Sequence, residues 1–344
     1  MQARCRKYEL IFKRPAGTSR GVLNTKETWF IMLEDEGRTG IGECAIFRGL
    51  SSDDRPEYAE ILQSVCSNIE AYLGDPSALE DWPSIRFGLE SAMFWLENGP
   101  SFGDQNFVNS NRGIKINGLI WMGDEQYMLE QIESKLTQGF SCLKMKIGAL
   151  DFQKEMDILE RLRARFPADQ LELRVDANGA FSPDDALAKL KRLAELQIHS
   201  IEQPIRAAQL EEMSKLCAET NIPIALDEEL IGVNKIAQKK ELLDKIRPQY
   251  IILKPSLHGG FKGSEEWIDI AGSLGIAWWM TSALESNLGL NAIAQYLSQK
   301  DIHLPQGLGT GQLFENNIPS PLELRSDQLF YNQAKSWDLQ MIGK

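Results

Sequence analysis

The chain has 344 residues, 43% of them hydrophobic, which is enough for one large or two medium domains with a full core. Its 37 basic and 49 acidic residues give a net charge of −12 and a pI near 5.0, which argues against an electrostatic hold on nucleic acid or on an anionic membrane. We therefore expect a small-molecule partner.

The N-terminus, MQARCRKYELIF, lacks the continuous apolar segment of a signal peptide, and no stretch approaches eighteen uninterrupted apolar residues. The five cysteines are scattered and form no CxxC motif, so they indicate neither a disulfide framework nor a thiolate zinc site. These features predict a cytoplasmic protein with no membrane span.

The first part of the chain predicts an α+β unit. Residues 8–15, 27–35 and 39–47 have the composition of strands, and residues 56–74 and 83–99 have the pattern of helices. Two segments of this unit, 17–21 and 45–51, could close over a binding site and exclude water, or they could be ordinary surface loops. Arg20 lies in the first of them and is a candidate substrate contact.

From residue 113 the pattern changes to alternating strands and helices. Eight strand candidates, the last near residue 302, are separated by seven helical segments, as expected for a parallel α/β barrel. The last stretch lacks this alternation, and we expect it to fold back on the N-terminal unit. The predicted division is residues 1–112 for the first part of a capping domain, 113–311 for the barrel, and 312–344 for the return that completes the cap.

Five charged residues end, or nearly end, consecutive strand candidates of the barrel: Lys146, Asp176, Glu202, Asp227 and Lys254. They are separated by 30, 26, 25 and 27 residues, close to the length of one strand, one helix and two short loops. The carboxyl ends of barrel strands open on one face, so these side chains are expected to converge there. The spacing predicts three carboxylates flanked by lysines in one pocket.

The three carboxylates, Asp176, Glu202 and Asp227, predict a metal site. Converging carboxylates repel one another unless a cation holds them, and oxygen ligands suit a hard divalent ion, of which Mg²⁺ fits best. Taken singly, each acid could instead cap a helix.

Lys144 and Lys146 are two residues apart, so in a strand they share one face while Leu143 and Met145 alternate with them. In an open antiparallel sheet this would be an ordinary solvated face, whereas in a barrel with both faces covered the lysines point inward. We predict Lys146 as a general base that removes a proton from carbon beside a carboxylate. Lys254, from the opposite side, could be a second acid or base or a fixed positive charge.

Several motifs occur in order along nearly the whole chain: KMK, RVDANGAF, IEQP, LDEE, LKPS and TSALESNLGLNAIAQ. With them the chain resembles the enolase superfamily, specifically its muconate-lactonising subgroup. The resemblance implies an α+β cap over a modified TIM barrel, (β/α)7β, with Mg²⁺ on the carboxylate trio. It also implies that Lys146 and Lys254 lie on opposite faces of a small carboxylate substrate.

Within that subgroup the chain is most similar to the o-succinylbenzoate synthase family, on SALESN (282–287), GLGTGQLFENN (307–317), GECAIFRGLS and GTSRGVL. This resemblance implies a lyase of menaquinone biosynthesis that removes water in syn fashion from a succinyl-hydroxy-cyclohexadiene carboxylate. The second-strand lysine would take the α-proton and return a proton to the departing hydroxide, while the sixth-strand lysine stabilises the intermediate.

Further candidate substrate contacts are Arg174, Ser282, Ser286 and Gly309. Arg174 matches an arginine of the family motif, although it could instead only pair with barrel carboxylates. Ser282 and Ser286 border a predicted helix start that could bind a carboxylate. Gly309 lies in a glycine-containing loop that could approach substrate closely. His258, in a loop, is expected to be structural or exposed.

Other functions fit parts of the pattern. An N-acylamino acid racemase or dipeptide epimerase of the same subgroup would use the same lysines and metal, although the Asp-x-Asp pair usual in dipeptide epimerases is missing near the eighth strand. A Schiff-base aldolase would leave the carboxylates without a role. A phosphate-binding barrel and a non-catalytic magnesium binder are weaker alternatives. The sequence makes no prediction of oligomeric state.

Overall fold

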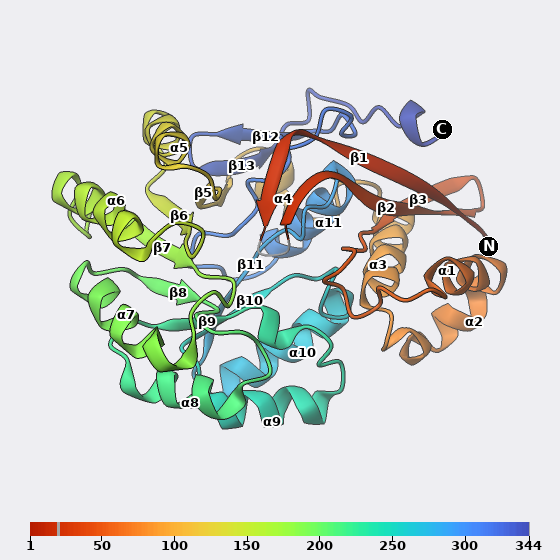
Figure 1. The fold of residues 1–344 in the computed structure, drawn as a ribbon. Helices are drawn as coiled ribbons and strands as arrows, with labels where there is room; N and C mark the ends of the chain where they lie inside the picture. The colour runs from red at the N-terminus through yellow and green to blue at the C-terminus, as the bar shows by residue number, and fades with distance from the viewer. Residues whose placement is uncertain (19–20, 344) are drawn as a thin grey trace.

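The computed structural model describes residues 1–18 and 21–343, and it begins with an antiparallel sheet. Strands β1 (Gln2–Thr18), β2 (Gly21–Asp35) and β3 (Arg38–Cys44) pair in the order β1-β2-β3. Helices α1 (Tyr58–Ser67), α2 (Ile69–Gly74) and α3 (Pro83–Asn98) follow, with the 3-10 turn η1 (Pro76–Leu79) between α2 and α3. Strands followed by helices confirm the predicted α+β unit, drawn in red and orange in Figure 1.

The sheet and α3 approach too closely for ordinary side chains at the contact. A Cβ atom added at Gly42 would lie 1.8 Å from the carbonyl oxygen of Gly88, so only glycine fits there. Apolar residues of β2, β3, α1 and α3 form a separate core, including Ile31, Leu33 and Leu62. The short helix α4 (Gln105–Val108) then leads into the second part of the chain.

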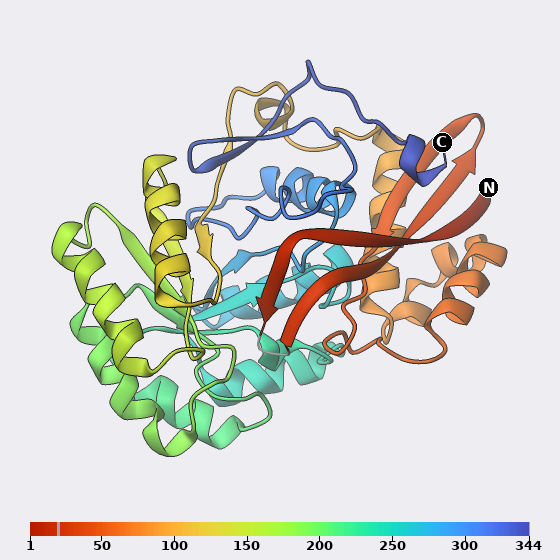
Figure 2. The same ribbon diagram turned by 45° about the horizontal axis from the view of Figure 1, so that its top comes forward.

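The second part is a curled parallel sheet covered by helices. Its seven strands are β5 (Gly118–Ile120), β6 (Cys142–Lys146), β7 (Glu172–Asp176), β8 (Ser200–Glu202), β9 (Ile224–Leu226), β10 (Tyr250–Leu253) and β11 (Ala277–Met280), paired in chain order. The helices are α5 (Glu125–Thr137), α6 (Phe152–Arg165), α7 (Pro183–Glu195), α8 (Leu210–Glu219), α9 (Ile236–Ile246), α10 (Gly260–Ser273) and α11 (Asn287–Ser298). Figures 1 and 2 show these helices around the outside of the sheet.

The barrel closes through a very short eighth strand. Gln306 bridges Ile116 beside β5, and Gly307 bridges Thr281 after β11, both in parallel fashion. The strand expected near residue 302 therefore lies slightly later, after Pro305, which has no N–H to donate to a neighbouring strand. The sheet and this closure confirm the predicted (β/α)7β barrel with an α+β cap.

The C-terminal stretch turns back along the molecule. Strand β13 (Gln328–Tyr331) pairs with β12 (Leu322–Arg325) and with β4 (Ile114–Lys115), a small sheet that the sequence did not predict. The segment before it runs along β1, where Lys13 N donates to Leu313 O at 2.9 Å. Ile342, in the final 3-10 turn η3 (Gln340–Ile342), packs with Phe30 of β2. We retain the division into 1–112, 113–311 and 312–344 as a proposal.

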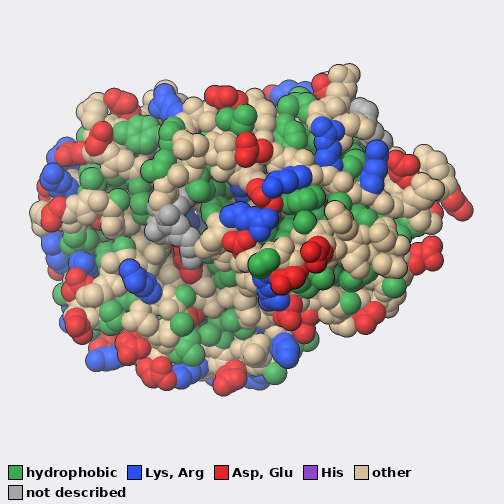
Figure 3. Space-filling model, turned by 45° about the vertical axis from the view of Figure 1, so that its right-hand side comes forward, with side chains coloured by type: hydrophobic (Ala, Val, Ile, Leu, Met, Phe, Trp, Pro, Cys, Tyr) green, Lys and Arg blue, Asp and Glu red, His purple; other side chains and the backbone are tan. Residues whose placement is uncertain are grey.

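Acidic and basic side chains lie next to one another on the face shown in Figure 3. Among the described residues, we find no helix with both the length and the apolar character that crossing a membrane requires.

Candidate active site

A cavity lies at the carboxyl ends of the barrel strands, below part of the cap. All five residues that the strand spacing predicted to converge line it, together with Lys144. Asn117, Asn178, Glu228, Thr281, Thr310 and the apolar residues Phe47, Leu50, Leu119, Trp121, Leu257, Trp279 and Leu284 complete much of the wall. The predicted convergence is therefore observed, and the cap contributes Phe47 and Leu50.

Strand register explains how the charged residues meet. In the parallel ladders, Lys146 of β6 is paired with Asp176 of β7, and Asp176 is paired with Glu202 of β8. Paired residues on neighbouring strands project to the same side, so these three side chains enter the cavity as a row. Leu143 and Met145 alternate with the lysines and are buried under the helices, as the sequence predicts.

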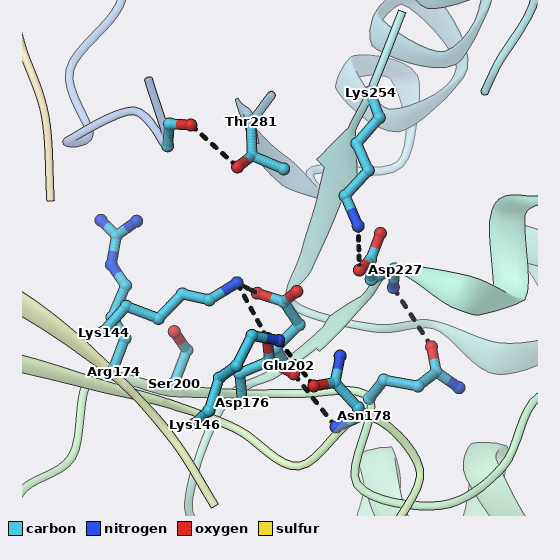
Figure 4. A network of polar contacts seen from close by, with 12 residues as sticks. Lys144, Lys146, Arg174, Asp176, Asn178, Ser200, Glu202, Asp227, Lys254 and Thr281 are labelled. Atoms are coloured by element: carbon cyan, nitrogen blue, oxygen red, sulfur yellow. Dashed lines mark hydrogen bonds and ion pairs between the residues drawn. The ribbon is translucent and has the colours of Figure 1, made fainter. Parts of the chain in front are cut away.

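The row is held by ion pairs, which Figure 4 shows. Lys144 Nζ lies 3.1 Å from Asp176 Oδ2 and also donates to Glu202 Oε2. Lys146 Nζ donates to the same Asp176 oxygen at 2.9 Å and to Asn178 Oδ1 at 2.6 Å. One lysine thus bridges two carboxylates, and the other joins a carboxylate to a neutral amide.

Lys254 enters from β10, across the cavity from Lys144 and Lys146 (Figure 4). Its Nζ donates to Asp227 Oδ2, and the aspartate is completely buried. The next residue, Glu228, accepts a hydrogen bond from Asn178 Nδ2 at 3.1 Å and also lines the cavity. The two candidate catalytic lysines therefore reach the cavity from different sides.

The cluster shifts the ionisation of its members strongly. Burial opposes the charge of Lys144, but the charges of Asp176, Glu202 and Asp227 outweigh it and raise the pKa of this lysine. Burial and the neighbouring Asp176 raise the pKa of Glu202 well above its usual range. Burial also acts against ionisation of Asp176, but Lys144 and Lys146 more than offset it and lower the pKa of this aspartate. The cluster therefore favours the charged forms of Lys144 and Asp176 and disfavours that of Glu202.

Comparison with known proteins identifies the fold family. Residues 127–324, more than half of the chain, match the enolase C-terminal domain-like family. The chain belongs to the enolase superfamily. An o-succinylbenzoate synthase of Desulfotalea psychrophila is 47% identical over 94% of this chain and 96% of its own length.

Solved structures agree with this assignment. MenC from Desulfotalea psychrophila LSv54 superposes with a TM-score of 0.84 at 42% identity, covering 96% of this chain and 99% of the other. A dipeptide epimerase of Enterococcus faecalis V583, complexed with Mg and the dipeptide L-Leu-L-Tyr, shares the fold with a TM-score of 0.83 over 96% of each chain, at 19% identity. The superfamily resemblance predicted from the motifs is thus confirmed, and the identity to the Desulfotalea psychrophila o-succinylbenzoate synthase is far higher than to this epimerase.

Enolase-superfamily enzymes are metal-dependent, and the carboxylates of this member suit a hard divalent cation. Asp227 Oδ1 and Glu228 Oε2 are buried and accept no hydrogen bond, which leaves lone pairs available to an ion. As the described side chains stand, no three of His, Cys, Asp or Glu are arranged to hold an ion jointly. Lys144 lies between Asp176 and Glu202, and Lys254 donates to Asp227 Oδ2. The donor set fits a cation that takes the place of Lys144 and Lys254 at these oxygens.

The predicted substrate contacts divide into two groups. Ser282 and Gly309 line the cavity. Ser286 does not line it: its hydroxyl donates to Glu43 Oε2 of β3 at 2.5 Å, because it caps α11 at the junction with the cap. Arg20 lies outside the residues that the structure describes.

Arg174 also lies away from the cavity wall. Its Nε donates to Glu172 Oε1 at 2.7 Å, Nη1 donates to Pro305 O at 2.9 Å, and the guanidinium stacks on Trp279 at 4.3 Å from the ring centroid. Arg174 is 1% exposed, so it acts inside the barrel as a link between β7 and the closing strand. These contacts match the alternative of pairing with barrel carboxylates, and a contact with substrate stays a prediction.

His258 is structural rather than exposed. Its Nδ1 accepts a hydrogen bond from Lys254 N at 3.0 Å, and burial lowers its pKa to about 3, so the ring is neutral. It therefore supports the turn that carries Lys254.

Sequence reasoning missed Asn178 and Glu228 as members of the site. Both lie within the motifs RVDANGAF and LDEE, and each is two residues beyond the end of its strand. Position after a strand end was the available signal, but the direction of each side chain depends on the turn that follows.

Proposed function

We propose that this chain is an o-succinylbenzoate synthase, a hydro-lyase that converts a succinyl-hydroxy-cyclohexadiene carboxylate into o-succinylbenzoate. The observation that carries the proposal is the 47% identity to an enzyme of that name along nearly the whole of both chains. The cavity agrees with it, since it combines opposed lysines, four carboxyl groups and a partly apolar wall. We also propose that the enzyme acts in menaquinone biosynthesis and in the cytoplasm, where its five free cysteines would remain reduced.

In this proposal Lys146 is the base that removes the proton from the ring carbon beside the substrate carboxylate. It is the lysine nearest the end of β6, and it lines the cavity. Its Nζ donates to one carboxylate and to one neutral amide. After abstraction, Lys146 carries the proton and returns it to the departing hydroxide, which leaves as water. Because one group performs both transfers, the elimination takes place on one face of the ring.

Lys254 supplies a positive charge on the other side of the substrate. Burial opposes its charge, but Asp227 and Glu228 outweigh burial and raise its pKa, so it is an ammonium group at neutral pH. A fixed cation stabilises the negative charge that develops on the substrate after proton removal. Lys144 adds a further positive charge beside Asp176 and Glu202.

We propose Mg²⁺ as the cofactor, held by Asp176, Glu202 and Asp227. When bound, it would supply Lewis-acid stabilisation of the negative charge on the substrate carboxylate, an effect of several kcal/mol in general.

The apolar part of the wall suits the substrate ring. Phe47 and Leu50 of the cap line the cavity, and Trp121 and Leu284 belong to the same apolar cluster. When the substrate displaces water from this apolar wall, the electrostatic interactions of the charged groups in the cavity become stronger. Ser282 and Gly309 are proposed contacts for substrate oxygens on this side.

An N-acylamino acid racemase or dipeptide epimerase is the second candidate, favoured by the entry of Lys146 and Lys254 from different sides. Racemisation needs a base on one face of the α-carbon and an acid on the other, and these two lysines could fill both roles. The two candidates therefore differ in substrate rather than in catalytic groups.

The deciding experiment compares two reactions of the purified enzyme with Mg²⁺ in D₂O. One is water loss from the cyclohexadiene carboxylate, followed by the absorbance of the aromatic product; the other is α-proton exchange of N-succinylamino acids, followed by NMR. We expect a kcat/KM for dehydration at least 10²-fold higher than for exchange. Faster exchange than dehydration would favour the racemase, and no turnover of either substrate would contradict both candidates.

A further inference from the structure

Asn178 joins three groups of the site through one short side chain and its own backbone. Its Oδ1 accepts from Lys146 Nζ at 2.6 Å, and its Nδ2 donates to Glu228 Oε1 at 3.1 Å. Its backbone N–H donates to Asp176 Oδ1 at 3.0 Å. Figure 4 shows the amide of Asn178 beside the amine of Lys146. Asn178 therefore touches the proposed base directly, and it touches two acids of the same site.

These contacts limit the directions that the Lys146 amine can present. Nζ is tetrahedral: one position is bonded to Cε, and two further positions point to Asp176 Oδ2 at 2.9 Å and to Asn178 Oδ1 at 2.6 Å. A single position remains, and Lys146 lines the cavity. In the neutral amine this position holds the lone pair, and in the ammonium it holds the third proton. Two fixed acceptors thus define the axis along which Lys146 can take or give a proton.

Glu228 determines which end of the Asn178 amide faces the lysine. A carboxylate accepts hydrogen bonds but does not donate them, so it binds the NH₂ group and leaves the oxygen towards Lys146. If the amide were reversed, its NH₂ group would oppose the lysine N–H groups, and the second acceptor would be lost. Glu228 therefore acts on the base through Asn178.

The backbone of Asn178 supports a specialised role. Its φ of +43° lies in the left-handed region, which asparagine tolerates better than most residues and which is found at functional sites. This conformation lets one residue direct its N–H to Asp176 and its side chain to Lys146.

We propose that Asn178 is a positioning residue that, oriented by Glu228, aims the reactive position of Lys146 at the substrate carbon. The inference rests on the proposed function, because it takes Lys146 as the base. It predicts that loss of the Asn178 amide slows the proton-transfer step and leaves the binding of substrate and metal nearly unchanged.

The test uses Asn178→Gly, because glycine adopts positive φ freely and keeps the backbone N–H to Asp176 while removing the amide. Asn291→Ala is the matched control: Asn291 is also buried and its Nδ2 donates to Pro100 O at 3.0 Å, but it does not line the cavity. Each variant is assayed for kcat and KM with the cyclohexadiene substrate and with the same substrate deuterated at the abstracted position. Thermal unfolding monitors the fold.

We expect Asn178→Gly to lower kcat by about 10²-fold, the size of loss that a misplacement of about 1 Å can cause, with KM within about 3-fold of wild type. The deuterium isotope effect on kcat should exceed that of wild type, because proton transfer becomes slower relative to other steps. The Mg²⁺ concentration for half-maximal activity should stay within about 3-fold, because the Asp176 contact is retained. Asn291→Ala should leave kcat, KM, the isotope effect and the Mg²⁺ requirement at their wild-type values.

Glu228→Gln provides a second readout that leaves the Asn178 backbone untouched. Its carboxamide can turn either end to Asn178, so we expect a smaller loss in kcat, about 10-fold, and little further loss when it is combined with Asn178→Gly. A wild-type isotope effect and kcat in Asn178→Gly, or a rise in the Mg²⁺ requirement that accounts for the whole loss, would overturn the positioning role. Failure of the wild-type enzyme to turn over the substrate would instead overturn the proposed function.

Discussion

Glu43 provides a quantitative test of how the cap is attached to the barrel. This fully buried carboxylate of β3 accepts four hydrogen bonds: from Thr28 Oγ1 at 2.8 Å and Ser286 N at 3.0 Å on Oε1, and from Ser286 Oγ at 2.5 Å and Gly289 N at 3.0 Å on Oε2. Two of the donors are backbone N–H groups in the first turn of α11. The carboxylate of the cap therefore satisfies free N–H groups at the start of that helix. Its negative charge also interacts favourably with the positive end of the helix dipole.

Glu43→Gln replaces one acceptor oxygen by NH₂. The hydroxyls of Thr28 and Ser286 can rotate to accept from it, but one backbone N–H, of Ser286 or Gly289, must lose its acceptor. A buried donor left without a partner costs about 1–3 kcal/mol. Loss of the negative charge at the helix N-terminus costs a further ~0.5–2 kcal/mol. We therefore expect the free energy of unfolding to fall by roughly 2–5 kcal/mol.

Urea unfolding followed by circular dichroism measures this change. Glu34→Gln on β2 is the matched control, because Glu34 is about half exposed and its ion pair with Arg4 spans 3.5 Å. The control should lie within about 0.5 kcal/mol of wild type. Since Ser286 directly follows the 282–285 segment, part of which lines the cavity, Glu43→Gln should also raise KM. Stability within about 0.5 kcal/mol of wild type in Glu43→Gln would refute the reasoning.

Three further predictions concern the site and the cap. Lys146→Ala should abolish dehydration while its circular dichroism spectrum stays that of wild type; turnover at a wild-type rate would contradict the role of base. Excess EDTA should abolish activity and added Mg²⁺ should restore it, and undiminished activity in EDTA would argue against the metal site. Asp53 is buried, which raises its pKa to about 6 despite hydrogen bonds from Ser84. The folded state therefore binds this proton more tightly than the unfolded state, so between pH ~4 and ~6 stability falls as pH rises, by roughly 2–3 kcal/mol from this group. Asp53→Asn keeps an oxygen for Ser84 and should remove this part of the pH dependence; an unchanged profile in urea unfolding would contradict the assignment.

The sequence predicted the features that repeat along the chain. The spacing of Lys146, Asp176, Glu202, Asp227 and Lys254 follows from the length of a βα unit, and every one of them lines the cavity. Likewise, the alternation in CLKMKI placed the lysines on the inner face, because a strand has a period of two. These are local properties, so they can be read from a single segment.

The features that the sequence did not predict depend on contacts between distant segments. Ser286 stays a predicted substrate contact, and its hydrogen bonds to Glu43, which is 243 residues away in sequence, could not be read from the helix start that it borders. Arg174 shares a strand face with Asp176, yet it lies deeper in the barrel and reaches Pro305 of the closing segment. The two bridging residues of the eighth strand are too few to form a hydrophobic pattern.

The charges of the cavity explain why metal and substrate would depend on each other. The ionisable groups that line it are Lys144, Lys146 and Lys254 on the positive side and Asp176, Glu202, Asp227 and Glu228 on the negative side. Four carboxyl groups thus face three amines, and burial and neighbouring carboxylates raise the pKa of Glu202 and Glu228, so a substrate carboxylate would enter a site already rich in acid groups. A bound divalent cation would add two positive charges and offset this repulsion. Because unbalanced charge is costly in a buried site, the proposed cation favours substrate binding as well as proton removal. Chelation should therefore weaken binding of the carboxylate in addition to stopping the reaction.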